Sequence, residues 1–197
     1  MTTTTPARRL NKSDRREQLL DVAADFLTEA GAAGLTMEGL AERAGVSKAL
    51  PYSHFDNSDA VLVALYQREV ARMGEGIAIA LAACGPDATG EERMRAAFHA
   101  YFDVIEQRGA VLAMLLGPGS RVPTLAEDNG AARNFLAEIV AESFDVTPKQ
   151  AAIIAELYQS IAAGAVASWA KGLGSRRFVE ELVVRFTYAG VAAVSGE

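Results

Sequence analysis

The chain has 197 residues and half of them are apolar, so it is long enough and apolar enough to bury a hydrophobic core. Its one cysteine, Cys84, cannot form an internal disulfide, and neither a signal peptide nor an apolar run of membrane-spanning length stands out. We therefore expect a globular cytoplasmic protein without a membrane segment. The net charge of −6 argues against a nonspecific nucleic-acid binder.

The basic side chains are concentrated at the N-terminal end. Residues 1–16 carry five basic side chains and a single acid, Asp14, whereas residues 59–197 carry 12 basic and 17 acidic side chains. Residues 1–12 are predicted to be a flexible basic arm. Such an arm can be a solvated tail, or it can become ordered on a polyanion. Both can hold if the free tail is solvated and becomes ordered on binding.

Residues 13–30 are predicted to form a first helix. Ser13 is a suitable N-cap and Gly31 a suitable end. Between them apolar side chains recur at helical spacing, at Leu19, Val22, Ala23, Phe26, Leu27 and Ala30.

Residues 36–55 have the pattern of two short helices joined by a turn. The first helix has one apolar face, formed by Met37, Leu40, Ala41 and Ala44. Gly45 supplies the turn, and Ser47 is suited to cap a second helix beginning at Lys48. Pro51 disfavours helical geometry at the residue before it, which leaves open a later start at Leu50. This layout is typical of a helix-turn-helix, whose second helix enters the major groove of DNA.

An ordered set of residues in this segment resembles the N-terminal domain of the TetR family of transcriptional regulators. The set consists of Thr36, Ala41, Gly45-Val46-Ser47, Tyr52 and Phe55, preceded by an amphipathic helix. The resemblance covers roughly residues 13–75. It implies an all-α fold: an N-terminal three-helix helix-turn-helix DNA-binding domain over residues 13–58, and a C-terminal helical ligand-binding and dimerisation domain over residues 59–197.

The resemblance also implies which side chains face DNA. Thr36 and Tyr52 are expected against phosphates, and side chains near Lys48, Ala49 and Ser53 close to bases. A lysine can donate to guanine and an alanine methyl can contact a thymine methyl. The candidate DNA-binding residues are Lys12, Arg15, Arg16, Thr36, Ser47, Lys48, Ala49, Tyr52, Ser53 and His54.

Two residues depart from the family pattern. Pro51 stands where an apolar residue is usual, and Ser58 where a lysine facing phosphate is common. DNA affinity is then expected to depend more on Lys12, Arg15 and Arg16. Leu50 and Phe55 are expected in the core, and His54 as a partly packed surface residue.

The remainder of the chain is predicted to be helical. Residues 56–59 are suited to start a long helix through Val70, and a second helix is expected from Glu91 to Gln107, ended by Gly109. Residues 110–116 are either one or two helical turns or a buried loop, and another helix is expected between Ala131 and Phe144. The sequence Thr147-Pro148-Lys149-Gln150 is a strong helix start.

The last two helices, over residues 148–171 and 176–194, are predicted to form a homodimer interface. The stretch from Leu157 to Ala170 carries no charged side chain, and the last helix has a broad apolar stripe, so the two helices cannot cover each other alone. Pairing with a second copy would bury both, with Gly164, Ala165 and Gly190 allowing close approach. The alternative is that these faces pack within one subunit.

Aromatic and polar side chains in this half could line a site for an unidentified small-molecule ligand, although they suit an ordinary core equally well. The candidates are Phe98, His99, Tyr101, Phe102, Met114, Phe135, Tyr158 and Gln159.

We find no motif of a catalytic, metal or cofactor site, so we expect neither an enzyme nor a bound cofactor. The resemblance predicts a regulator, most simply a repressor that a ligand releases from palindromic double-stranded DNA. The alternative is a helical small-molecule-binding or scaffold dimer whose DNA-binding function has been lost.

Overall fold

The structure is a computed structural model that describes residues 11–31, 34–116, 134 and 136–193. This described part contains helices and no strand, which confirms the predicted all-α class. The chain divides into two compact units. One consists of Met1–Gln67 with Ala110–Pro123, and the other of Arg68–Gly109 with Thr124–Glu197.

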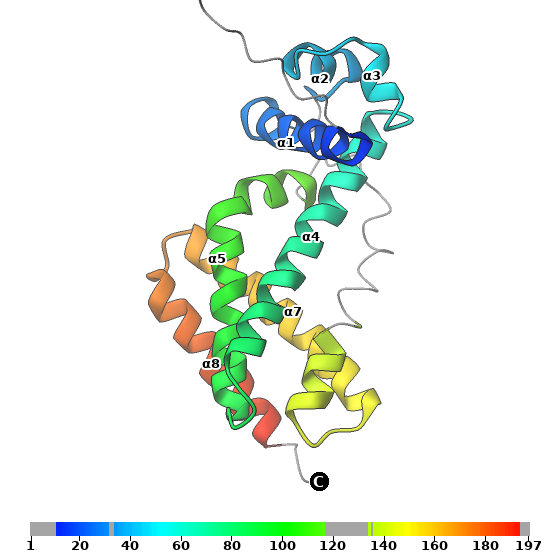
Figure 1. The fold of residues 1–197 in the computed structure, drawn as a ribbon. Helices are drawn as coiled ribbons and strands as arrows, with labels where there is room; N and C mark the ends of the chain where they lie inside the picture. Colours follow the sequence, from blue (N-terminus) through cyan, green and yellow to red (C-terminus); the bar gives the residue numbers. More distant parts are fainter. Residues whose placement is uncertain (1–10, 32–33, 117–133, 135, 194–197) are drawn as a thin grey trace, which may run out of the picture. The chain divides into compact units, whose positions relative to one another are not determined.

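The first unit contains three helices, the beginning of a fourth and the last residues of α5 (Gly90–Leu116) (Figure 1). These are α1 (Lys12–Ala30), α2 (Met37–Arg43), α3 (Ala49–Tyr52) and the start of α4 (Ser58–Ala83). Helix α2 contacts both α1 and α3. The core includes Leu19, Leu20, Leu27, Leu40, Phe55, Val61, Leu62 and Leu65, each at most 5% exposed. The predicted apolar face of α1 is partly wrong, because Leu20 was not assigned to it and Ala30, which was, is exposed.

The two ends of α1 were not predicted equally well. The N-cap is Asn11, whose side-chain oxygen accepts a hydrogen bond from the backbone N–H of Asp14 at 2.8 Å, so the assignment of Ser13 is wrong. Both residue types can cap a helix, and the sequence does not say which of two neighbours does so. The predicted end at Gly31 is confirmed: its φ is 72°, and its N–H donates to the carbonyl of Leu27.

The second unit holds most of α4, most of α5 (Gly90–Leu116), α7 (Pro148–Ala170) and α8 (Arg176–Ala192). Residues 136–143 are also helical, in agreement with the helix expected there, and the rest of that predicted segment lies outside the described residues except residue 134. Helices α7 and α8 pack against each other. The core of this unit includes Met94, Phe98, Phe102, Val140, Ile154, Tyr158, Val183 and Val184.

Side chains cap the helices of the second unit as their sequences predict. Thr147 accepts from the N–H of Gln150, and the Gln150 side chain accepts from the N–H of Thr147 at 2.8 Å, with Pro148 in the first helical position. Ser175 caps α8 by accepting from the N–H of Phe178. The predicted end of a helix at Gly109 is wrong, because α5 continues to Leu116 and residues 110–116 are helical.

Helix α7 is long and apolar enough, by length and composition, to cross a membrane. The uncharged stretch from Leu157 to Ala170 is shorter, which is why no such run was evident from the sequence. The core helix of a soluble protein passes the same test, so this is weak evidence for a membrane span. Only 28% of the apolar window is buried within the chain, so much of α7 lacks a cover.

Candidate nucleic-acid interface and ligand site

Helix α3 is one turn long and begins at Ala49, with Lys48 as its N-cap. No side chain caps it, so the assignment of Ser47 as a side-chain cap is wrong; the Ser47 carbonyl accepts from the N–H of Leu50 at 2.9 Å instead. The start lies between the two predicted positions. Pro51 is tolerated because it lies in the first turn, where backbone N–H groups have no partner within the helix.

One face of this segment points into the unit and the other is exposed. Pro51 and Phe55 are buried, and Leu50 is partly buried. The exposed side chains are those of Ser47, Lys48, Ala49, Tyr52 and Ser53. Four of these five are the residues for which the resemblance implies base or phosphate contacts, and none of them is needed for the core.

Thr36 and Tyr52 are exposed, and each already makes a polar contact. The Thr36 hydroxyl oxygen accepts from the N–H of Gly39 at 3.0 Å and so caps α2, which leaves its proton available. The Tyr52 hydroxyl donates to the Glu38 carboxylate at 3.4 Å. Partial desolvation, and then the charge and hydrogen bond of Glu38, raise the pKa of Tyr52, so its hydroxyl stays protonated and can donate to a phosphate.

The predicted cations of α1 lie near His54. Desolvation lowers the pKa of His54, and the charges of Lys12, Arg16 and Arg15 lower it further, so these three cations form an electropositive group beside a neutral His54. The Arg16 guanidinium also lies over the ring of Phe55, 4.8 Å from its centre. Phe55 therefore positions Arg16 beside the end of α3.

Glu38 was not predicted to be part of this surface. Its carboxylate reaches a tyrosine 14 residues away, across the turn between α2 and α3. A contact of that kind follows from how the two helices pack, and no local spacing reports it. A negative charge here opposes nonspecific phosphate binding.

Four of the candidate ligand residues come together in the second unit. The Phe98 and Tyr158 rings are 6.2 Å apart, and Phe102 lies 5.8 Å from both Tyr101 and Trp169. We call Phe98, Tyr101, Phe102, Tyr158 and Trp169 the aromatic cluster. Phe98, Phe102 and Tyr158 are at most 8% exposed.

The other ligand candidates are placed elsewhere or cannot be described. Gln159 is only partly buried. The side chain of His99 is 62% exposed and pairs with Glu180 at 2.7 Å. Met114 belongs to the part of α5 assigned to the other unit, and its side chain lies outside the described residues, as does Phe135.

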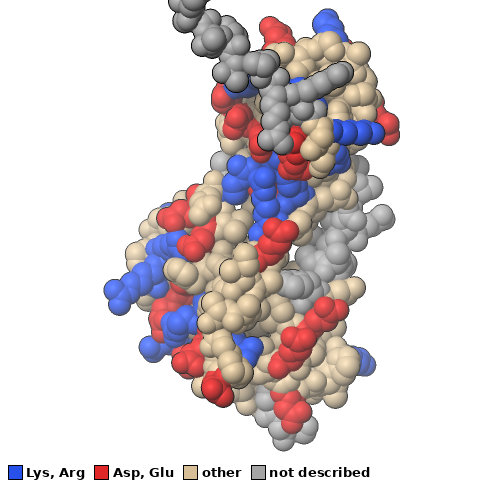
Figure 2. Space-filling model, in the orientation of Figure 1, with Lys and Arg blue, Asp and Glu red and all other residues tan. Residues whose placement is uncertain are grey.

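His99 lines a groove of about 820 Å³ between α5 and α8. The groove walls also carry Arg95, Arg176 and Glu181, all of which take part in ion pairs. Around α8, Figure 2 shows acidic and basic side chains interspersed. This groove is open and charged, unlike the apolar ligand site expected from the sequence.

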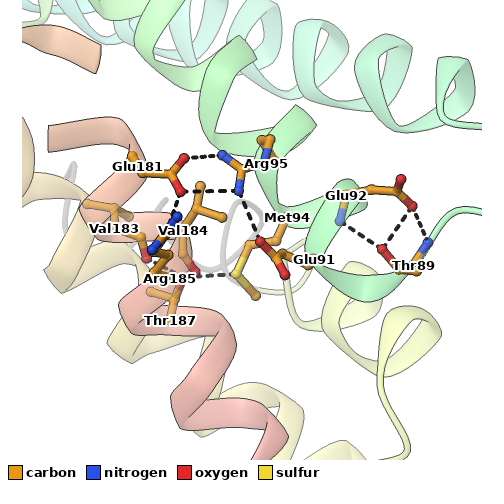
Figure 3. A network of polar contacts seen from close by, with 10 residues as sticks. All are labelled: Thr89, Glu91, Glu92, Met94, Arg95, Glu181, Val183, Val184, Arg185 and Thr187. Atoms are coloured by element: carbon orange, nitrogen blue, oxygen red, sulfur yellow. Dashed lines mark hydrogen bonds and ion pairs between the residues drawn. The ribbon is translucent and has the colours of Figure 1, made fainter. Parts of the chain in front are cut away.

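The contacts that join α5 and α8 are drawn in Figure 3. Arg95 donates to both Glu91 and Glu181, and Arg185 donates to Glu181 as well. Hydrogen bonds from Arg95 and then Arg185 lower the pKa of Glu181 to about 2. On the buried side, the Thr187 hydroxyl lies 2.9 Å from the sulfur of Met94 and donates to the carbonyl of Val183.

A buried ionic group in the second unit was also not predicted. Glu69 has no exposed surface and accepts two hydrogen bonds from Arg108, at 2.9 and 2.7 Å, with Arg68 and Arg72 also close. A local signal existed, since Glu69 follows Leu65 and Tyr66 at helical spacing on the buried face of α4. Its main partner is 39 residues away.

Comparisons with known proteins bear on this arrangement. Residues 19–65 match the family model of bacterial regulatory proteins, tetR family. Over 98 residues the chain is 37% identical to the HTH-type transcriptional activator FasR of Mycolicibacterium smegmatis. This alignment covers 50% of this chain and 43% of that protein. The chain thus aligns with less than half the length of this curated relative.

Solved structures share the fold over nearly the whole chain. A TetR-like transcriptional regulator from Rhodococcus sp. RHA1 is 23% identical, with a TM-score of 0.71 over 96% of this chain and 100% of the other. FadR from Bacillus subtilis, solved in complex with stearoyl-CoA, is 16% identical, with a TM-score of 0.70 over 89% and 98%. The helix-turn-helix segment thus matches the TetR family of bacterial regulatory proteins over residues 19–65, and over nearly the whole chain the likeness to these solved structures is one of fold.

Proposed function

We propose that this protein is a cytoplasmic, sequence-specific DNA-binding regulator that a small-molecule ligand releases from its operator. The observation that carries the proposal is that the segment around α3 has one buried side and one exposed side. Pro51 and Phe55 anchor the segment in the core, while Lys48, Ala49 and Ser53 remain exposed. An exposed polar face on a buried anchor is what a helix needs in order to enter a major groove.

The electropositive group formed by Lys12, Arg15 and Arg16 beside His54 supports the phosphate contacts of this proposal. These side chains lie next to α3, although the chain as a whole is acidic. They supply the local positive charge that DNA binding requires, and their contribution falls as salt is raised.

We propose that the working species is a homodimer formed through α7 and α8. Large apolar side chains on these helices are 53–66% exposed, namely Ile153, Leu157, Phe178, Leu182 and Phe186. Gly164 and Gly190 have open space where a side chain would be, which allows another helix to approach closely. A two-fold axis would bury each stripe against its copy.

A dimer of this kind would present two copies of α3 to one duplex. The operator would then be a palindrome whose half-site centres are about 34 Å apart, or a multiple of that distance. The same geometry explains how a ligand would act. A ligand that binds better to a dimer with another spacing of the two α3 helices favours that state. It lowers the affinity of the dimer for DNA by the difference in the ligand's own affinity for the two states.

The first experiment is selection of bound sequences from random duplex DNA, at near-physiological salt. The wild type is expected to recover a palindrome. Lys48→Ala should relax sequence preference, and Tyr52→Ala should weaken binding to all sequences, because base contacts specify and phosphate contacts position. Lys171→Ala removes an exposed lysine at the end of α7 and serves as the matched control.

Specific binding that survives both substitutions would exclude α3 as the DNA-contacting element. Recovery of no motif by any variant, with the dimer intact, would favour the alternative of a ligand-binding or scaffold dimer that has lost DNA binding.

Ligand release fits repression, and we propose that role first. Activation is the second candidate, favoured by the name of the relative FasR, a transcriptional activator. A reporter gene placed behind the selected operator separates them: deletion of the regulator raises expression if it represses and lowers expression if it activates.

A further inference from the structure

The most unusual polar group in the second unit is the hydroxyl of Tyr158. The residue lies in α7, is 7% exposed, and packs within the aromatic cluster against the ring of Phe98. Its Oη is buried and has no hydrogen-bond partner among the described residues.

A buried hydroxyl without a partner is costly, because it has given up its hydrogen bonds to water. Phenylalanine would fill the same space without that cost, so packing alone does not explain a tyrosine here. Burial also raises the pKa of Tyr158, so the group remains a neutral hydrogen-bond donor at physiological pH.

The surroundings restrict what this donor can bind. The core around Tyr158 consists of apolar and aromatic side chains. Glu69 is the fully buried charged residue of the described part, and its partners are arginines. Among the described residues no buried cation could pair with a buried anionic group of a ligand at Tyr158, and such a group is expensive to bury.

We propose that Tyr158 is the polar anchor of the ligand site, where it donates to the uncharged carbonyl oxygen of an otherwise apolar ligand. The regulatory role of this ligand rests on the proposed function. The binding of the ligand at Tyr158 does not depend on DNA binding. The aromatic side chains supply apolar contact, and the single hydroxyl fixes the orientation of the ligand.

The probe is 2-octanone, with octanoate as its charged counterpart. Trp169 is the one tryptophan of the chain and contacts Phe102 in the same cluster, so its fluorescence reports binding directly. We expect saturable binding of 2-octanone and binding of octanoate at least about tenfold weaker. Tyr158→Phe should weaken 2-octanone binding by about five- to tenfold, the factor expected for one hydrogen bond.

Tyr188→Phe makes the same chemical change at a partly buried tyrosine packed against the core of this unit, and should leave 2-octanone affinity unchanged. Without ligand, Tyr158→Phe should melt at or above the wild-type temperature, because no hydrogen bond is lost.

Three results would overturn the proposal. One is no saturable binding of 2-octanone to the wild type, and another is equal affinity in wild type and Tyr158→Phe. The third is a clearly lower melting temperature of ligand-free Tyr158→Phe, which would reveal an internal or water partner for the hydroxyl. DNA binding is measured separately, so loss of operator recognition with 2-octanone binding intact rejects the regulator and keeps the anchor.

Discussion

Glu69 shows how much a single residue can depend on distant partners. Its carboxylate is fully buried, and the Arg108 guanidinium donates two hydrogen bonds to it from α5. Burial raises the pKa of Glu69, but the hydrogen bonds and charges of Arg108, followed by the charges of Arg68 and Arg72, outweigh burial and leave the pKa below its ordinary value. The ionised form is therefore the one that the fold stabilises.

Arg108→Ala is expected to lower the free energy of unfolding by about 3 kcal/mol, because it leaves a buried carboxylate with less compensation. Urea titration followed by circular dichroism measures the change. The control is Arg185→Ala, which removes an exposed partner of Glu181 and should cost less than about 1 kcal/mol. Equal effects of the two substitutions would mean that burial of Glu69 adds nothing to the pair.

The same carboxylate gives stability a pH dependence. Because the folded pKa of Glu69 lies below the unfolded one, its stabilisation is complete above the unfolded value of about 4.3 and is lost as pH falls through the folded value. Glu69→Gln should remove this part of the acid sensitivity, which urea titrations at several acidic pH values would test. A wild type and a variant with parallel pH profiles would contradict the assignment.

Residue positions could be predicted from the sequence where one local pattern decides them. The buried faces of α1 and α2 follow from helical spacing, as does the burial of Phe55. Glu69 lies on the buried face of α4 by the same spacing, yet its burial is possible only because Arg108 lies opposite. Long-range pairs of this kind, like that of Tyr52 with Glu38, have no local signature.

At the scale of elements, the sequence predicted the start of α7 from its reciprocal cap. A single glycine, by contrast, did not reliably predict where a helix ends. Thr147 and Gln150 cap α7 where expected. Gly109 lies inside α5, where a glycine costs about 1 kcal/mol relative to alanine. Burial of Val111, Leu112 and Leu115 just beyond it outweighs that cost.

Thr147→Ala should lower the free energy of unfolding by about 1 kcal/mol, because it removes the side-chain oxygen that satisfies the N–H of Gln150. Thermal or urea unfolding measures this loss. Ser160→Ala is the matched control within α7: its exposed hydroxyl donates only to the carbonyl of Glu156, and alanine is the better helix former. A loss as large at Ser160 would show that the cap has no special role.

For the whole molecule, the sequence indicated an all-helical chain with a DNA-reading end and a larger helical remainder, and both features are present. The exposed stripes of α7 and α8 also agree with the expectation that these two helices cannot cover each other. In the proposed dimer a second copy covers the stripes, and neither the helical spacing nor the isolated fold contains that partner.

Phe186→Glu should convert the proposed dimer to a monomer at micromolar concentration, because a charge on the stripe would be buried against its own copy. Light scattering after size exclusion gives the mass. Ile79→Glu alters an equally exposed apolar side chain on α4 and should leave the mass unchanged. If Phe186→Glu keeps the wild-type mass, the interface lies elsewhere.

Cys84, the one thiol of the chain, is half-buried just beyond the end of α4, where its sulfur donates to the carbonyl of Ala80. The unaltered protein can thus accept one spin label per subunit, and a two-fold dimer would carry a symmetric pair. The distance between the two labels would then characterise the dimer without ligand or DNA. A change in this distance on adding ligand or operator would show which arrangement of the dimer the ligand or the operator favours.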